Sequence, residues 1–243
     1  MFGDEARAWL ERVPRLLDAA CLHLGVEVVR ELPGGLLAST WIVATADGRG
    51  AVLKVPSPWG RGEDELAALR VWAGRGAPAI LAHDPATGAR LLERIEPGSH
   101  AVGAGAAEVA AVLTLLHQGP SAGLPTLEET VARRLDRAEE EGRATPERLS
   151  WARTALQRRC DRARERVLLH GDFDHRNLLV CRQRGLCAID PLPCVGDPAY
   201  DAGYWAQAAG LPGRRLRVEG IAEAAGFEVE RVRDWCAIVA VHG

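Results

Sequence analysis

Lysine is almost absent from this chain of 243 residues, which also lacks long apolar runs and a strong charge of either sign. Lys54 is the single lysine among 30 basic residues, and the formal net charge is −3. No apolar stretch approaches the roughly 18 residues of a transmembrane helix. The segment Met1–Glu5 lacks the basic start of a signal peptide. These absences predict a cytoplasmic protein that binds neither membranes nor nucleic acids.

The six cysteines include no C-x-x-C pair. Cys181, Cys187 and Cys194 lie close together in the sequence, so a thiol metal site is one interpretation. Their spacing does not match zinc sites, and no histidine completes a ligand set. Reduced, partly buried thiols are the better interpretation.

The single lysine lies in an apolar, strand-like run, Ala51–Val55. A charge inside such a strand needs a partner. Arginine is a broad planar fork, whereas lysine is a compact point charge on a thin stem. All other basic residues of the chain are arginine. Lys54 therefore indicates a position that requires the compact charge of lysine. A surface-reaching strand lysine is the alternative.

The first part of the chain has the pattern of an antiparallel sheet. Apolar residues recur at helical spacing over 5–22, where Pro14 should kink the helix or restart it as a second one. Turn residues then separate short apolar runs. We expect strands over 26–32, 39–46, 51–55, 79–83 and 89–95, with a helix over 63–73.

The second part is mainly helical. Pro97-Gly98-Ser99 is a natural boundary, so we expect an N-terminal lobe over 1–96 and a C-terminal lobe over 97–243. The pattern predicts an α+β protein, with short strands over 178–181 and 186–189 and helices over 105–118, 127–141, 146–165, 199–209, 214–225 and 228–241. The apolar helical pattern runs to Val241; either the helix ends there or further chain would follow.

The most informative motif spans 168–191, where Asp172 precedes Asn177 by five residues and Asp190 follows after thirteen more. Phosphoryl transfer from ATP needs a carboxylate that orients the attacking hydroxyl and oxygen ligands that hold Mg²⁺. The protein-kinase loop H-R-D-x-x-x-x-N has the same Asp-to-Asn step. We therefore predict a kinase with Asp172 as catalytic base and Asn177 and Asp190 as metal ligands.

Lys54 fits the strand lysine that contacts the ATP phosphates in kinases. Its acidic partner should come from the next helix, with Glu65 the first choice and Glu63 the second. The alternative is that these acids only stabilise the N-terminus of the helix by interacting with its dipole.

Three further residues are candidates for nucleotide binding. The loop 32–39 lies where a phosphate-covering loop belongs, and its amides and the Ser39 hydroxyl could bind phosphate oxygens. An ordinary hairpin is the equal alternative. The carbonyl of Glu93 and the amide of Ile95 are candidates for adenine because they end the predicted sheet.

Residues around the motif have two interpretations. Asp201 either caps a helix or accepts the amides of the catalytic loop. His170 is expected to be structural, because the base position is already taken. His175 and Arg176 lie within the loop and could face substrate or phosphate.

With these residues in place, the chain resembles the aminoglycoside/hydroxyurea antibiotic resistance kinases. The likeness runs over nearly the whole chain and is most specific at Ala188–Pro191 and Val195–Pro198 with Asp201. It implies a bilobal, protein-kinase-like fold, transfer of the ATP γ-phosphate to a hydroxyl of a small antibiotic, and the roles given above for Lys54, Asp172, Asn177 and Asp190. Arg176 stands where many relatives have a small residue. It adds bulk and positive charge beside the expected acceptor site, so it bears on which substrate binds.

The resemblance implies a Mg·ATP-dependent kinase of streptomycin or a related cationic antibiotic. Such a cation needs acidic contacts, for which Asp174 and Asp197 are candidates. A kinase of hydroxyurea, a sugar or an amino alcohol is the alternative, and an inactive nucleotide-binding protein is a hypothesis of another class. The choice between ATP and GTP, the hydroxyl modified and the oligomeric state are open at this level.

Overall fold

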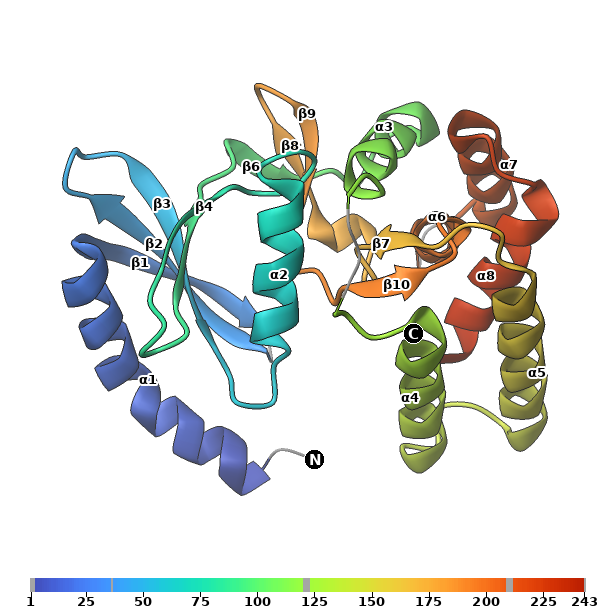
Figure 1. Ribbon diagram of the computed structural model, residues 1–243, viewed down its shortest axis with the longest axis horizontal. Coiled ribbons are helices and arrows are strands. Elements are labelled where there is room, and N and C mark those ends of the chain that lie inside the picture. The colour runs from blue at the N-terminus through green and yellow to red at the C-terminus, as the bar shows by residue number, and fades with distance from the viewer. Residues whose placement is uncertain (1–2, 36, 120–122, 209–211, 243) are drawn as a thin grey trace. The chain divides into compact units, whose positions relative to one another are not determined.

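The chain forms two structural units, seen here in a computed structural model that describes residues 3–35, 37–119, 123–208 and 212–242 (Figure 1). One unit comprises Met1–Gly74 and Pro78–Ile95, and the other comprises Arg75–Ala77 and Glu96–Gly243. The sequence placed the boundary one residue later, after 96, and did not anticipate that Arg75–Ala77 belongs with the second unit.

The first unit is built on an antiparallel sheet of five strands in the order β1-β2-β3-β5-β4. Neighbouring strands pair antiparallel throughout. The five expected strands are all present, and their bounds are β1 (Val26–Gly35), β2 (Ala38–Thr45), β3 (Gly50–Pro56), β4 (Ile80–His83) and β5 (Arg90–Glu93).

Helices α1 (Gly3–Leu24) and α2 (Gly62–Trp72) cover opposite faces of this sheet (Figure 1). Side chains alternate between the two faces of a strand. Leu53 and Val55 of β3 therefore join Leu17 of α1 in one buried core, while Lys54 between them reaches Glu65 of α2. Because successive side chains of β3 face opposite sides of the sheet, Lys54 points toward α2.

Helix α1 runs through Pro14 as one helix, so of the two outcomes expected at Pro14, a kink or a restart, the restart as a second helix is wrong. An interior proline removes one backbone hydrogen bond. Trp9, Val13, Leu17 and Ala20 form a buried stripe on both sides of Pro14. This packing holds both halves of α1 against the sheet.

The second unit is mainly helical, with short strands around the predicted catalytic motif, residues 168–191. Strands β6 (Pro97–His100), β8 (Leu178–Cys181) and β9 (Gly185–Ala188) form one sheet, and β7 (Val167–Leu169) pairs with β10 (Cys194–Gly196). The sequence did not predict β6 and β10. The helices are α3 (Ala106–Leu116), α4 (Leu127–Glu140), α5 (Pro146–Arg162), α6 (Ala199–Gln207), α7 (Arg214–Ala225) and α8 (Val229–His242).

Helices α6 and α8 approach closely at Gly203. A Cβ atom at this position would lie 2.6 Å from Cβ of Trp235 and 2.8 Å from the amide nitrogen of Cys236. Trp235 is fully buried and packs edge-to-face on Tyr200. Glycine therefore allows α6 to sit deep against α8, which fixes the helix that follows the catalytic motif.

Two further findings concern the described part of the chain. It contains no helix long and apolar enough to cross a membrane. It also contains no cluster of three or more His, Cys, Asp or Glu side chains able to hold a metal. Cys181, Cys187 and Cys194 are buried.

Candidate functional site

The catalytic motif forms a loop between β7 and β8 and continues through the β8–β9 hairpin. Leu169 of β7 pairs with Cys194 of β10, which fixes the start of the loop. The carbonyl of Asn177 accepts a hydrogen bond of 2.9 Å from the amide of Ile189. That bond ties the two ends of the hairpin together and places Asp190 next to Asn177.

Asp172 has both carboxylate oxygens occupied by donors. Oδ2 accepts a hydrogen bond of 3.0 Å from Nδ2 of Asn177. Oδ1 accepts one of 2.5 Å from the hydroxyl of Tyr204, and Nη2 of Arg134 lies 4.0 Å from the same oxygen. The Asp172 side chain is still 29% exposed. A carboxylate has about four acceptor positions, so a hydroxyl could still donate to Asp172.

Asn177 and Asp190 supply oxygens of the kind that hard cations prefer. Nδ2 of Asn177 also donates to the backbone carbonyl of Asp172, at 2.9 Å. This orientation turns Oδ1 of Asn177 to the opposite side of its amide group. Asp190 is exposed and has a left-handed backbone with φ of 55°, a conformation often stored at functional sites.

Asp201 of α6 holds the start of the catalytic loop. Its fully buried carboxylate accepts hydrogen bonds from the amides of His170, at 2.8 Å, and Gly171, at 3.0 Å. Nε2 of His117 lies 3.1 Å from the same carboxylate. Of the two interpretations offered by the sequence, the structure shows the loop-holding one.

His170 is a fully buried part of the loop framework. Nε2 lies 2.9 Å from the carbonyl of Ile189, and Nδ1 lies 3.3 Å from the amide of Asp172. The carbonyl can only accept and the amide can only donate, so the ring is the neutral Nε2–H tautomer. Burial lowers the pKa of His170, which keeps this tautomer neutral.

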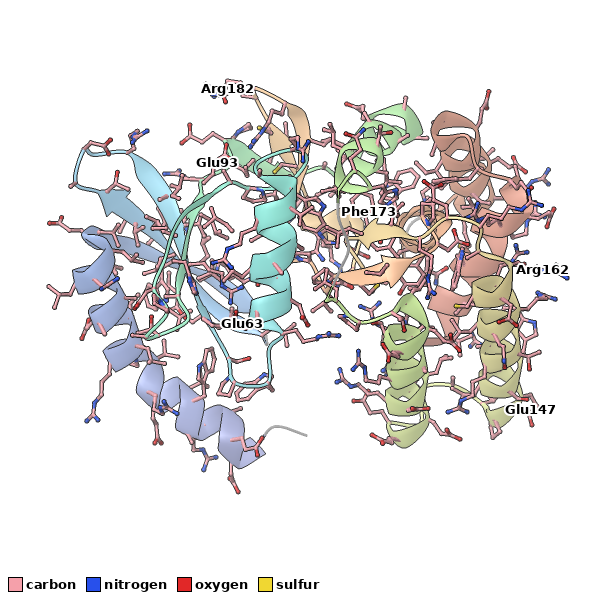
Figure 2. The ribbon with its side chains drawn as sticks, viewed as in Figure 1. Glu63, Glu93, Glu147, Arg162, Phe173 and Arg182 are labelled. Carbon is pink, nitrogen blue, oxygen red and sulfur yellow. The ribbon has the colours of Figure 1, made fainter. Side chains whose placement is uncertain are left out.

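The interior of the loop is organised by Asp174. Its carboxylate caps the short helix η1 (His175–Asn177) by accepting the Arg176 amide at 2.9 Å. It also contacts Nε of Arg176 at 2.7 Å and Nδ1 of His175 at 3.1 Å. The Arg176 side chain is 76% exposed, whereas Phe173 is fully buried inside the second unit (Figure 2).

Asp197, expected as a substrate contact, is placed inside the fold. It is 2% exposed and accepts hydrogen bonds from Ala199 N, at 2.9 Å, Trp235 Nε1, at 2.8 Å, and Arg231 Nε, at 2.9 Å. Arg231 and Trp235 lie on α8 and Ala199 begins α6, so the carboxylate joins α8 to the start of α6. We find no surface from which it would meet a substrate.

In the first unit, Lys54 belongs to a buried group of three charges. Nζ of Lys54 lies 2.6 Å from Oε1 of Glu65, and Nη1 of Arg90 lies 2.6 Å from Oε2. Lys54 is 7% exposed and Arg90 is 1% exposed. Glu63, the second-choice partner, is exposed in the first turn of α2 (Figure 2). Lys54 therefore pairs with the first-choice acid.

The expected phosphate-covering loop is largely strand. β1 extends to Gly35, which pairs with Ala38 of β2, and Leu36 lies outside the described residues. The buried Ser39 hydroxyl accepts a hydrogen bond of 2.9 Å from Trp41 Nε1. The segment is thus a hairpin, and the Ser39 hydroxyl, which accepts from Trp41, keeps its own hydrogen to donate; its role in phosphate binding stays a prediction.

Glu93 and Ile95, the adenine candidates, lie at the end of the first unit. Glu93 is the last residue of β5, where its amide donates to the carbonyl of Ala79 at 2.9 Å. Its carboxylate Oε2 also accepts from the Ala79 amide at 3.1 Å. Ile95 is buried at 8% exposure.

Four residues of these sites were not found from the sequence. Arg90 pairs with Glu65, His117 contacts Asp201, and Tyr204 and Arg134 surround Asp172. No local spacing marks them. The sequence holds one weak signal for Tyr204. The apolar helix 199–207 carries two tyrosines four residues apart, and this spacing places both on one helix face.

A cavity of about 400 Å³ lies beside the catalytic loop in the second unit. His175 forms part of its wall, together with the start of α3, Trp205, Leu216 and Arg217. No carboxylate lines the described part of this cavity. It is therefore mainly apolar, with its polar contributions from an imidazole and a guanidinium.

The antiparallel sheet of the first unit, the mainly helical second unit and the Asp172–Asn177–Asp190 arrangement define a kinase-like phosphotransferase. A choline kinase from Streptococcus pneumoniae has this fold, with a TM-score of 0.68 over 96% of this chain and 89% of that one at 17% identity. Residues 26–243 match the family model described as aminoglycoside/hydroxyurea antibiotic resistance kinase. The chain belongs to this family.

Two characterised relatives show what the family does elsewhere. A streptomycin 6-kinase from Streptomyces griseus is 32% identical over an alignment of 217 positions, which covers 82% of this chain and 68% of the relative. A hydroxyurea phosphotransferase from Kitasatospora aureofaciens is 30% identical over an alignment of 255 positions, gaps included, which covers 96% of this chain and 72% of the relative. The family and fold predictions from the sequence are thus confirmed, and the chain is a phosphotransferase.

Proposed function

We propose that this chain transfers the γ-phosphate of Mg·ATP to a hydroxyl of a small antibiotic, with Asp172 as the catalytic base. The geometry of Asp172 is the main support. Its carboxylate is fixed from both sides yet 29% exposed. A base that only positions an acceptor hydroxyl and takes its proton needs this combination.

The donor set near Asp172 fits a magnesium ion bound to nucleotide phosphates. Asn177 would contribute Oδ1 and Asp190 a carboxylate oxygen, both of which are hard ligands. Bound Mg·ATP supplies the transferable phosphate and the positive charge that stabilises its oxygens. The chain itself holds the acceptor hydroxyl on Asp172 and takes up its proton there.

Lys54 would contact the nucleotide phosphates from the first unit. Glu65 fixes the ammonium group at 2.6 Å, and lysine suits a phosphate as a point charge. We also propose that the backbone groups of Glu93 and Ile95 bind adenine. Glu93 ends β5, which is the last strand of this sheet along the chain, and Ile95 follows it.

Streptomycin is the first acceptor to test, because a streptomycin kinase is among the relatives. Hydroxyurea is the second, because a hydroxyurea phosphotransferase is also among the relatives. Asp197 is buried against Arg231 and Trp235, and no carboxylate lines the described part of the cavity beside His175. A small neutral acceptor needs no acidic wall, whereas a polycation does.

A panel of acceptors with γ-labelled ATP and Mg²⁺ tests the proposal. It should contain streptomycin, hydroxyurea, choline and a neutral sugar, with Asp172→Ala as the matched inactive control. We expect label transfer to one of the first two and its loss in Asp172→Ala. Equal transfer by Asp172→Ala would overturn the mechanism.

Resistance in cells tests the antibiotic assignment separately. A sensitive bacterium expressing the wild-type chain should tolerate streptomycin or hydroxyurea better than one expressing Asp172→Ala. Transfer only to choline or a sugar would move the chain to metabolic kinases. Nucleotide binding with no transfer to any acceptor would revive the inactive nucleotide-binding hypothesis.

A further inference from the structure

Tyr204 contacts the proposed catalytic base directly, although no local motif marks it. Its hydroxyl donates a hydrogen bond of 2.5 Å to Oδ1 of Asp172. Burial, followed by the negative charge of Asp172, raises the pKa of Tyr204. The hydroxyl therefore stays protonated and can act only as the donor to this carboxylate.

Helix α6 holds the catalytic loop at two successive points. Asp201 accepts the amides of His170 and Gly171, and Tyr204, three residues later, donates to Asp172. Residues three apart lie on the same face of a helix. Because α6 is packed tightly on α8 at Gly203, this face is a rigid support for the loop.

Arg134 of α4 is the group that would compete for Asp172. Its Nη2 lies 4.0 Å from Oδ1, too far for a hydrogen bond. Burial disfavours its charge, but neighbouring Tyr200, Tyr204 and Asp172 more than offset this and raise the pKa of Arg134. It is thus a permanent cation beside the base.

Two tyrosines contact Arg134, and one of them, Tyr204, also donates to Asp172. The Tyr200 hydroxyl accepts a hydrogen bond of 2.8 Å from Nη1 of Arg134. The guanidinium lies 5.5 Å from the ring centroid of Tyr204, within cation–π range. Without the Tyr204 hydroxyl, Arg134 could close on Asp172 as a two-point ion pair and occupy the positions that an acceptor hydroxyl needs.

We propose that Tyr204 is a positioning residue for this reaction, whose hydroxyl fixes the Asp172 carboxylate and keeps it from pairing with Arg134. The inference rests on the proposed role of Asp172. Tyr204 fixes Oδ1 and Asn177 fixes Oδ2. The positions that remain on the carboxylate then point toward the exposed side, where the acceptor hydroxyl must bind.

Tyr204→Phe tests this with a loss of one oxygen atom and an unchanged ring. We expect kcat to fall about 10- to 100-fold, the range for losing one hydrogen bond to a charged group. The KM for ATP should stay within about twofold, because Tyr204 acts on the acceptor side. Streptomycin, hydroxyurea and water, as slow ATP hydrolysis, serve as acceptor probes.

Tyr200→Phe is the matched control, because Tyr200 lies on the same helix and its hydroxyl contacts Arg134 instead of Asp172. It removes the same atom from a fully buried ring. We expect a smaller fall in kcat than in Tyr204→Phe, because Asp172 keeps its hydrogen bonds from both Asn177 and Tyr204 in this variant. An equal fall in both variants would assign the effect to packing and overturn the positioning role.

The decisive measurement repeats Tyr204→Phe in the Asp172→Ala background, using single-turnover transfer from γ-labelled ATP. If Tyr204 acts through Asp172, the substitution changes the residual rate less than about twofold there. A full additional loss would overturn the proposal, as would wild-type kcat in Tyr204→Phe alone. In contrast, wild-type turnover by Asp172→Ala would overturn the proposed function itself.

Discussion

Lys54 and Arg90 lie directly opposite each other on β3 and β5, and both cations contact the carboxylate of Glu65. Such a group is costly to bury, because one acid serves two bases. The strand register places the two cations side by side, since the side chains of opposed residues emerge on the same face. Glu65 is therefore the residue on which this part of the first unit depends.

Glu65→Gln should destabilise the first unit strongly. The substitution leaves the buried cations Lys54 and Arg90 without their shared acid, a change that typically costs about 3–5 kcal/mol. Urea unfolding at pH 7.5 measures the free energy of unfolding. Glu63→Gln, an exposed position on the same helix, should change it by no more than about 0.5 kcal/mol. Similar losses in the two variants would contradict this prediction.

Gly171→Ala should disrupt the catalytic loop. Gly171 has φ of +77°, and a Cβ atom there would lie 2.0 Å from the carbonyl oxygen of Leu192. That backbone must move, although the Leu192 amide also bonds to the His170 carbonyl at 3.0 Å. We expect a loss of about 3 kcal/mol or more in stability, together with a large fall in transfer activity.

Gly185 provides the control for this substitution. Its φ is +78°, but a Cβ atom there would meet nothing within 4 Å. Gly185→Ala should therefore cost only the backbone strain of about 1–2 kcal/mol, with activity preserved. Comparable losses of activity in both alanine variants would show that backbone strain, and not the contact with Leu192, matters.

Much of this arrangement could be predicted from sequence, for reasons that particular residues make clear. The alternation of Ala51, Leu53 and Val55 around one lysine indicated a strand with a functional charge. The spacing of Asp172, Asn177 and Asp190 indicated the loop and hairpin, because chemistry restricts both residue types and separation. Local patterns of this kind are readable without knowing the fold.

The remainder depends on contacts between distant segments. Tyr204 meets Asp172 across 32 residues, and His117 meets Asp201 across 84. No sequence period links such pairs, since packing alone brings them together. The strand β6 was missed for a similar reason, because it is ordered by pairing with β8 and contains proline and glycine, which seldom occupy strands.

Asp201→Asn should weaken both stability and turnover. The carboxylate accepts hydrogen bonds from the amides of His170 and Gly171 and contacts His117. In asparagine an NH2 group replaces one of the two oxygens, so a donor would face a donor. A buried acceptor lost in this way costs about 2–4 kcal/mol. We expect kcat to fall while the KM for ATP changes little, as measured by steady-state kinetics.

Asp234→Asn is the matched control for Asp201→Asn. Asp234 lies on α8 and is 22% exposed beside Arg159. Losing a partly exposed pair of this type should cost no more than about 1 kcal/mol and leave kcat unchanged. Equal effects at the two aspartates would indicate that the loop amides do not depend on Asp201.

Acidification should destabilise the chain through its buried histidines, of which His242 offers the cleanest test. Burial, with the nearby positive charge of Arg134, lowers the pKa of His242 from its usual 6.5 to about 3. The unfolded state therefore binds a proton that the folded state does not, between about pH 6.5 and pH 3. As the pH is lowered through this window, the free energy of unfolding decreases. Above pH 6.5 His242 has no effect on it.

His242→Leu should remove one histidine's share of that loss. Between pH 7.5 and pH 5.0 a group with this shift costs about 2 kcal/mol. The loss in unfolding free energy over that interval should accordingly be about 2 kcal/mol smaller in His242→Leu than in wild type, as measured by urea unfolding at both pH values. His100→Leu, at an exposed position, should keep the wild-type loss. Parallel losses in His242→Leu and wild type would mean that His242 is protonated in the folded protein.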